Sequence, residues 1–172
     1  SVGDGVTISG CKVNTGNNKT AVIKAVAADK LTFSENSLTA GTETESIQIV
    51  RKIPDMDYIC ESENRLWGVS NEEKTIYASA LGDPKNFFVF QGISTDAYSL
   101  AVGSSGNFTG CCKLASSVLF WKENLLHKIL GSYPAEYALY TSDISGVQEG
   151  SYKSMAIIND TLFYKAPDGV YA

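Results

Sequence analysis

Histidine is almost absent from this sequence, and its scarcity limits the chemistry that the chain can perform. One histidine, His127, occurs among 172 residues. Any histidine-dependent acid–base site or zinc site would have to be built around that side chain. His127 lies in the alternating strand pattern of residues 125–129, and no motif nominates a nucleophile or an acid beside it. We therefore interpret His127 as a surface or edge-strand residue.

Basic patches, long apolar runs and catalytic signatures are missing as well. The net charge is −5 and the 14 Lys and Arg residues are scattered singly, which disfavours nucleic acid as a partner. No apolar run approaches the roughly 18 residues of a membrane span, so no membrane partner is expected. No phosphate-binding loop or zinc-protease motif occurs, and residues 103–106 are one residue short of a nucleophile elbow. The sequence thus predicts a protein that is not an enzyme, with no catalytic, cofactor-binding or metal-binding residues and no cofactor.

Carboxylates occur in close pairs, which raises the question of a glycosidase or a calcium site. The pairs are Glu43 with Glu45, Asp55 with Asp57, Glu61 with Glu63, and Glu72 with Glu73. A glycosidase needs two carboxylates that face each other across a cleft, and neighbouring positions in a turn do not provide this. Asp55 and Asp57 with loop carbonyls would suit calcium. Solvated turn carboxylates are the simpler interpretation.

The cysteines lack the spacing of metal ligands. They are Cys11, Cys60, Cys111 and Cys112. Consecutive strand residues point to opposite faces, so Cys111 and Cys112 cannot act as a C-x-x-C pair. We expect four buried, reduced thiols in a protein made in the cytosol. A disulfide such as Cys11–Cys60 is the alternative.

Residues 1–52 predict a small β domain. Short apolar segments at 6–8, 20–26, 31–33 and 46–50 alternate with polar turns. Four or five strands in such a short stretch indicate a small β-barrel or sandwich. Pro54 lacks a backbone donor and forces the residue before it to be extended, so we place the boundary of a second domain, 53–172, at this proline.

The second domain shows three similar units. Each has an apolar strand, a tight polar turn and an aromatic-rich strand, at residues 58–69, 110–122 and 155–165, and a further short strand follows at 75–78, 127–130 and 169–172. The aligned residues are Leu66, Leu119 and Leu162, followed by Trp67, Phe120 and Phe163.

This repeat favours an all-β chain whose second part resembles some of the blades of a β-propeller. Blades recur about every 40–50 residues, and radial stacking buries sheet faces that one small sheet cannot bury alone. Closed propellers have ~4–8 blades, and fewer than three are visible here. We therefore expect a truncated chain with a missing C-terminal continuation, or a homo-oligomer formed through the C-terminal strands.

Several short sequence motifs resemble those of virion proteins of bacteriophages. Residues 3–10, 17–23 and 31–33 resemble a small β domain that recurs in phage tail and head–tail proteins with the pattern G-D-x-V-x-I-S-G, N-N-G-T and L-T-V. Lys19 stands where that family often has glycine. Segments 53–60, 64–68, 76–79, 81–84 and 120–124 resemble structural proteins of phages and prophages of Gram-positive bacteria.

The resemblance implies a tail or tail-nozzle protein located in the virion, with a propeller-like body, other phage structural proteins as partners and no catalytic residues. Its function would then be to make assembly contacts. A carbohydrate-binding or host-recognition module is the alternative, which Tyr133, Tyr137 and Tyr140 would support if they cluster on one face. A propeller glycosidase is a third hypothesis.

Overall fold

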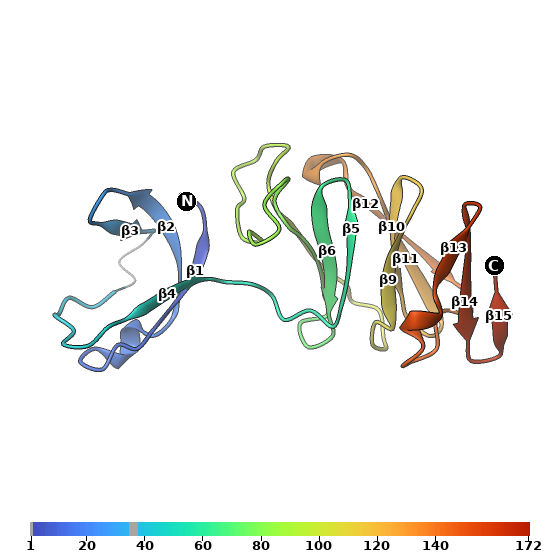
Figure 1. Ribbon diagram of the computed structural model, residues 1–172, viewed down its shortest axis with the longest axis horizontal. Coiled ribbons are helices and arrows are strands. Elements are labelled where there is room, and N and C mark those ends of the chain that lie inside the picture. Colours follow the sequence, from blue (N-terminus) through green and yellow to red (C-terminus); the bar gives the residue numbers. More distant parts are fainter. Residues whose placement is uncertain (1, 35–37) are drawn as a thin grey trace.

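The computed structural model describes residues 2–34 and 38–172, and within these ranges the chain is all-β. The described strands form four antiparallel sheets. Figure 1 shows the sheets following one another along the long axis, with the N-terminal sheet and the C-terminal sheet at opposite ends. The predicted all-β fold class is therefore confirmed.

The strands fall into sheets in chain order. The first sheet contains β1 (Gly5–Ser9), β2 (Thr20–Val26), β3 (Leu31–Phe33) and β4 (Gln48–Arg51). The second contains β5 (Tyr58–Ser62), β6 (Arg65–Ser70), β7 (Thr75–Ala78) and β8 (Tyr98–Ala101). The third contains β9 (Gly110–Leu114), β10 (Ser117–Trp121), β11 (Leu125–Leu130) and β12 (Ala138–Asp143). The fourth contains β13 (Ala156–Ile158), β14 (Thr161–Ala166) and β15 (Gly169–Tyr171). Short 3-10 helices are η1 (Thr15–Asn17), η2 (Pro134–Glu136) and η3 (Tyr152–Ser154).

The first sheet does not close into a barrel within the described residues, which corrects one of the two predicted forms. Its strand order is β3-β2-β1-β4, so β3 and β4 are edges. Loops take the place of further strands: the Glu43 carboxylate accepts hydrogen bonds from the backbone N–H groups of Lys12, Val13 and Asn14 at 2.8, 2.9 and 3.0 Å. These bonds lower the pKa of Glu43. The sheet is thus capped by its own loops.

The second and third sheets are four-stranded meanders in which each strand pairs with the next along the chain. The hairpins predicted in the three repeated units are all formed. Their turns use left-handed backbone, as at Asn64 (φ 61°) and Asp160 (φ 60°), which matches the twist of the flanking strands. A meander of this kind is compatible with a propeller blade, but closure into a propeller stays a prediction.

The structure corrects the repeat alignment by one residue in the middle unit. Counted from each hairpin turn, the third residue of the second strand is Trp67, Leu119 or Phe163. Leu119, not Phe120, is therefore the equivalent of Trp67. Because side chains alternate between faces, a slip of one residue assigns Phe120 to the wrong side of its sheet.

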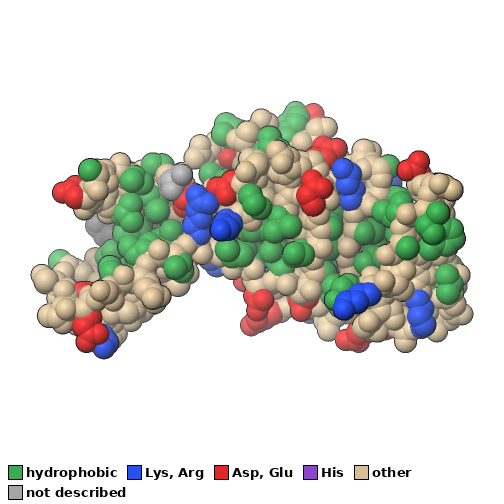
Figure 2. Space-filling model, viewed as in Figure 1, with side chains coloured by type: hydrophobic (Ala, Val, Ile, Leu, Met, Phe, Trp, Pro, Cys, Tyr) green, Lys and Arg blue, Asp and Glu red, His purple; other side chains and the backbone are tan. Residues whose placement is uncertain are grey.

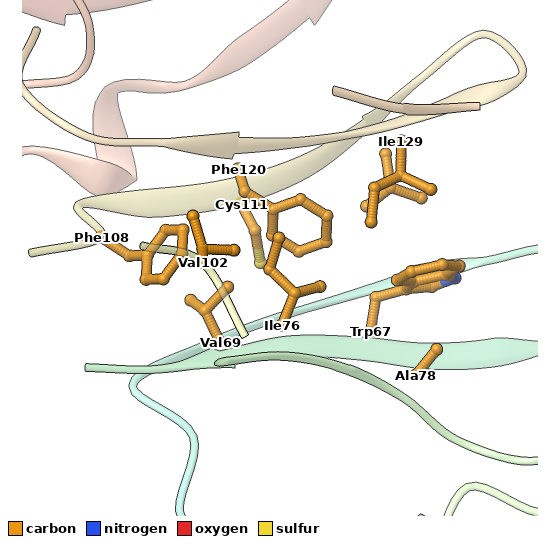
Figure 3. Close-up of a cluster of buried hydrophobic side chains, with 10 residues drawn as sticks. Trp67, Val69, Ile76, Ala78, Val102, Phe108, Cys111, Phe120 and Ile129 are labelled. Atoms are coloured by element: carbon orange, nitrogen blue, oxygen red, sulfur yellow. The ribbon is translucent and has the colours of Figure 1, made fainter. Parts of the chain in front are cut away.

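The main core lies between the second and third sheets. Figure 3 shows this cluster, in which Trp67, Val69, Ile76 and Ala78 of the second sheet face Cys111, Phe120 and Ile129 of the third. The rings of Trp67 and Phe120 lie 6.1 Å apart. Side chains on the opposite face of β10 pack against β14, where the rings of Trp121 and Tyr164 are 4.5 Å apart. Strand β10 is therefore buried on both faces.

Strand β4 ends at Arg51 and the next strand begins at Tyr58, so the proline-containing connector predicted as a boundary links the first and second sheets. The first sheet and the loop that follows β7 also contact each other through side chains. Arg51 Nε donates to Asp4 Oδ2 at 3.0 Å, and its Nη1 donates to Asp83 Oδ2 at 2.9 Å. Asn86 Nδ2 donates to Asp4 Oδ1 at 2.9 Å. These bonds join the first sheet to the loop that follows β7.

Candidate functional site

The loop between β7 and β8, residues 79–97, is held in place by a buried arginine. Arg65 of β6 donates through Nη1 to the carbonyl oxygen of Ser79 at 2.7 Å and through Nη2 to that of Ser94 at 2.6 Å. Nη1 also bonds the carbonyl oxygen of Asp96. A guanidinium presents five donors in a rigid fork, so one side chain fixes three points of the loop.

Asp96 organises the turn within this loop. Its Oδ2 accepts hydrogen bonds from the backbone N–H groups of Gln91, Gly92 and Ile93 at 2.5, 2.6 and 3.2 Å. Gly92 has φ +83°, a conformation that suits glycine. The other carboxylate oxygen, Oδ1, is buried and has no hydrogen-bond partner in the part of the chain that the structure describes.

This loop, β8 and η2 line an open cavity of about 570 Å³. Its walls are mainly apolar and aromatic, with the backbone and short side chains between them; they include Phe90, Ile93, Tyr98, Ser99, Tyr133 and Pro134. Phe90 and Tyr133 are exposed, whereas Tyr98 is half-buried against the main core. A concave, mostly apolar pocket with a few polar groups is the usual form of a small-ligand site.

The three tyrosines expected to mark a carbohydrate site do not gather on one face. Tyr133 lines the cavity, but the Tyr137 ring packs 5.1 Å from Trp67 and 5.0 Å from Tyr98 beside the core. Tyr140 is exposed on β12 away from the cavity lining. Phe90 and Tyr98 complete the aromatic wall instead. Sequence reasoning missed them because they meet Tyr133 only through the tertiary fold.

The prediction that His127 is a surface or edge residue is wrong. His127 lies on β11, between β10 and β12, and its side chain is buried. Its Nε2 is 2.8 Å from Ser104 Oγ, and its Nδ1 is 2.8 Å from Thr141 Oγ1. Burial lowers the pKa of His127, and the neighbouring Lys122 lowers it further. Both effects favour the neutral form of the imidazole.

Lys122 completes this buried polar cluster. Its ammonium donates to the carbonyl oxygens of Ser104 and Ser105 at 2.8 and 3.3 Å and lies over the Phe108 ring, 4.7 Å from its centroid. Burial lowers the pKa of Lys122. The side chain thus fixes residues 103–106, which lie in the connection between β8 of the second sheet and β9 of the third.

The contact between Ser104 and His127 has the spacing of a nucleophile and a base, but its third member differs from a catalytic triad. The group on Nδ1 is the Thr141 hydroxyl, whereas a triad has a carboxylate there to stabilise the imidazolium. The cluster instead satisfies buried polar groups, which is a structural task.

The carboxylate pairs do not converge into a metal site within the described residues. Asp57 accepts a hydrogen bond from the Asn71 backbone N–H at 2.8 Å, and Glu61 accepts one from the Asn64 backbone N–H at 3.1 Å. Glu61 thus acts within its own hairpin turn, and Asp57 binds the turn between β6 and β7. The structure also contains free cysteines at all four positions, with Cys11 in the first sheet and Cys60 beside the main core, so the alternative Cys11–Cys60 disulfide is not formed.

No protein-family model matches the chain, and no curated protein matches it. Among the described residues, no helix has the length and apolar character needed to cross a membrane.

Proposed function

We propose that the protein is a non-catalytic structural component of a bacteriophage virion, where it makes assembly contacts with other proteins of the tail. The observation that carries this proposal is the uncovered outer face of the fourth sheet. The resemblance of residues 3–10 and 53–60 to phage proteins supports the assignment to a virion.

In the repeat, the equivalent faces of the second and third sheets are each covered by the sheet that follows. Trp67 is 2% exposed because the third sheet covers it, and Leu119 is 4% exposed because the fourth sheet covers it. Phe163, the equivalent residue of the fourth sheet, is 37% exposed. The equivalent side chain is thus buried in the second and third sheets and partly exposed in the fourth.

This face carries further exposed apolar residues beside the polar Thr161 and Lys165. Ile158 pairs across the sheet with Thr161, and Val170 pairs with Lys165, so both point to the same side as Phe163. Their exposed fractions are 58% and 77%. Figure 2 shows hydrophobic side chains reaching the surface at this end of the molecule. Contiguous exposed apolar surface marks interaction sites.

The partner that fits is a β-sheet of a neighbouring virion protein with an apolar face of its own. Sheets pack face to face about 10 Å apart, as the second, third and fourth sheets already do in this chain. The outer strands β13 and β15 also present backbone edge groups on which a partner strand can pair. The proposed contact therefore continues an arrangement that the chain uses internally.

The test introduces a charge on this face and follows assembly. Ile158→Lys places an ammonium in the proposed interface, whereas Val26→Lys, at a strand position that is 54% exposed in the first sheet, is the matched control. Tagged chains are expressed in the phage-producing strain, and particles are purified and analysed by mass spectrometry. We expect wild type and Val26→Lys in the tail fraction and Ile158→Lys in the free fraction. Equal incorporation of all three, or absence of the wild-type chain from particles, would contradict the proposal.

A further inference from the structure

We propose that the cavity between the 79–97 loop and η2 binds an uncharged sugar ring. This inference is independent of the assembly proposal, because it concerns another surface and another class of ligand. It is carried by the chemistry of the cavity wall, by the way the wall is held and by an unpaired buried oxygen.

The wall suits a ligand that is apolar on its faces and polar on its rim. Phe90, Tyr133 and Pro134 offer apolar surface, and the Ser94 and Ser99 residues add hydroxyl groups. A sugar ring has C–H groups on its faces, which pack on aromatic rings, and hydroxyl groups around its edge. The exposed rings of Phe90 and Tyr133 leave such a stacking surface open to solvent.

Charge narrows the class of ligand. Among the described lining residues, Asp96 has the one ionisable carboxylate and none is basic. A phosphate or carboxylate ligand would find no cation in the wall, and the nearby carboxylate would repel it. Arg65 does not change this, because its guanidinium is buried and engaged with the carbonyl oxygens of Ser79, Ser94 and Asp96. An anionic ligand is therefore disfavoured, and a neutral ligand rich in hydrogen-bond donors fits the wall.

Asp96 belongs to the cavity lining and holds a carboxylate oxygen that lacks a donor. Its Oδ2 is fully used by three backbone N–H groups, while Oδ1 is buried and unpaired within the described residues. Buried polar atoms without a partner are rare, and they call for an explanation such as a ligand. A sugar hydroxyl is a donor of the kind that Oδ1 lacks.

The site is also held in its shape before any ligand arrives. Arg65 fixes the loop at three carbonyl groups, and Asp96 fixes the turn at three N–H groups. On the other wall, Tyr133 immediately precedes the proline of η2, whose fixed φ limits backbone motion. A wall ordered in advance loses less conformational entropy on binding.

The experiment uses the full 172-residue chain on a glycan microarray of bacterial surface polysaccharides and neutral monosaccharides. The best-binding sugar is then titrated by saturation-transfer NMR and calorimetry against Tyr133→Ala, Phe90→Ala and Tyr140→Ala. Tyr140 is a matched control, because it is an exposed tyrosine on β12 outside the cavity lining. A hexaproline peptide is titrated in parallel, since an aromatic-lined groove can also hold polyproline.

We expect Tyr133→Ala and Phe90→Ala to weaken sugar binding by about tenfold or more, because exposed aromatic anchors carry much of the binding energy at such sites. Tyr140→Ala is expected to bind as the wild type does. Circular dichroism spectra of all variants establish that they are folded. Three results would each overturn the inference: binding to no glycan on the array, unchanged sugar affinity in both cavity variants, or binding of the hexaproline peptide alone.

Discussion

The imidazole Nε2 of His127 lies 2.8 Å from the hydroxyl oxygen of Ser104, and the Nδ1 of the same ring lies 2.8 Å from the Thr141 hydroxyl. A single buried side chain thus joins the 103–106 loop, β11 and β12. Because His127 is only 1% exposed, both hydroxyl groups would lose their partner if the imidazole were removed. On this geometry His127, the residue first considered as a catalytic group, is a structural element of the third sheet.

Replacing this histidine is therefore predicted to cost stability. His127→Ala leaves a cavity and removes two hydrogen bonds, so the free energy of unfolding should fall by about 2–4 kcal/mol. Urea unfolding followed by tryptophan fluorescence measures the change. Lys128→Ala, which alters the next residue on the opposite face of β11, is the control and should change stability much less. A loss below about 0.5 kcal/mol for His127→Ala would show that the cluster is not structural.

The same residue predicts a pH dependence. Burial lowers the pKa of His127 in the folded chain below the ordinary value of 6.5, so the unfolded chain takes up a proton first as the pH falls. Stability from this group is fully present above pH 6.5 and is lost as the pH drops from 6.5 toward the lowered pKa, with a slope of up to about 1.4 kcal/mol per pH unit. Unfolding free energies at pH 7.5, 6.5 and 5.5 should fall more steeply for wild type than for His127→Gln. Identical slopes in the two proteins would refute the assignment.

The sequence predicts the local elements well where hydrophobic alternation is clean. The strands expected at 20–26 and 31–33 agree with β2 and β3, because polar turn residues bound both. The repeat alignment fails by one residue at β10 because Val118, Leu119, Phe120 and Trp121 are all buried. A strand covered on both faces carries no alternation from which its register can be found.

The burial of His127 and the cavity could not be predicted for a different reason. Ser104 and Thr141 lie 23 and 14 residues from His127, and no short motif connects them. Likewise, Phe90 and Tyr133 come from loops of different sheets and share only the cavity. Such sites are created by tertiary packing, so they cannot be predicted from the local sequence pattern or from residue propensities.

The join between the first and second sheets is predicted to depend on Arg51. This side chain bonds Asp4 at 3.0 Å and Asp83 at 2.9 Å, and Arg51→Ala removes both contacts at once. We expect faster cleavage of the 52–57 connector in limited proteolysis, because the connector is then less restrained. Lys24→Ala, an exposed position on β2, is the control. Cleavage at the wild-type rate in Arg51→Ala, or a first cut inside β10, would contradict the two-part division at residue 52.

The thiols are predicted to be reduced and slow to react in the folded chain. The hydrogen bond that the Cys111 thiol makes to Cys60, together with burial, raises the pKa of Cys111, and burial raises the pKa of Cys112 to about 11. Little thiolate therefore exists near pH 8, and thiolate is the reactive form. Alkylation without reductant should label Cys111 and Cys112 slowly in the native state, and all four cysteines once the chain is unfolded. Two labels or fewer after unfolding would reveal a disulfide.

The corrected repeat makes a quantitative prediction about equivalent positions. Trp67 and Phe163 occupy the same place after their hairpin turns, but Trp67 is covered by the third sheet while Phe163 faces outward. Trp67→Ala should lower the free energy of unfolding by about 3–5 kcal/mol, because it opens a cavity in the main core. Phe163→Ala should cost less, about 1–2 kcal/mol in the isolated chain, because 37% of this side chain is already exposed and no sheet closes over it. Denaturant unfolding of both variants, with Leu119→Ala as a buried equivalent expected to cost about 2–5 kcal/mol, measures the series. A large loss for Phe163→Ala in a monomer established by light scattering would mean that its face is already covered, and the proposed interface for a neighbouring sheet would then be ruled out.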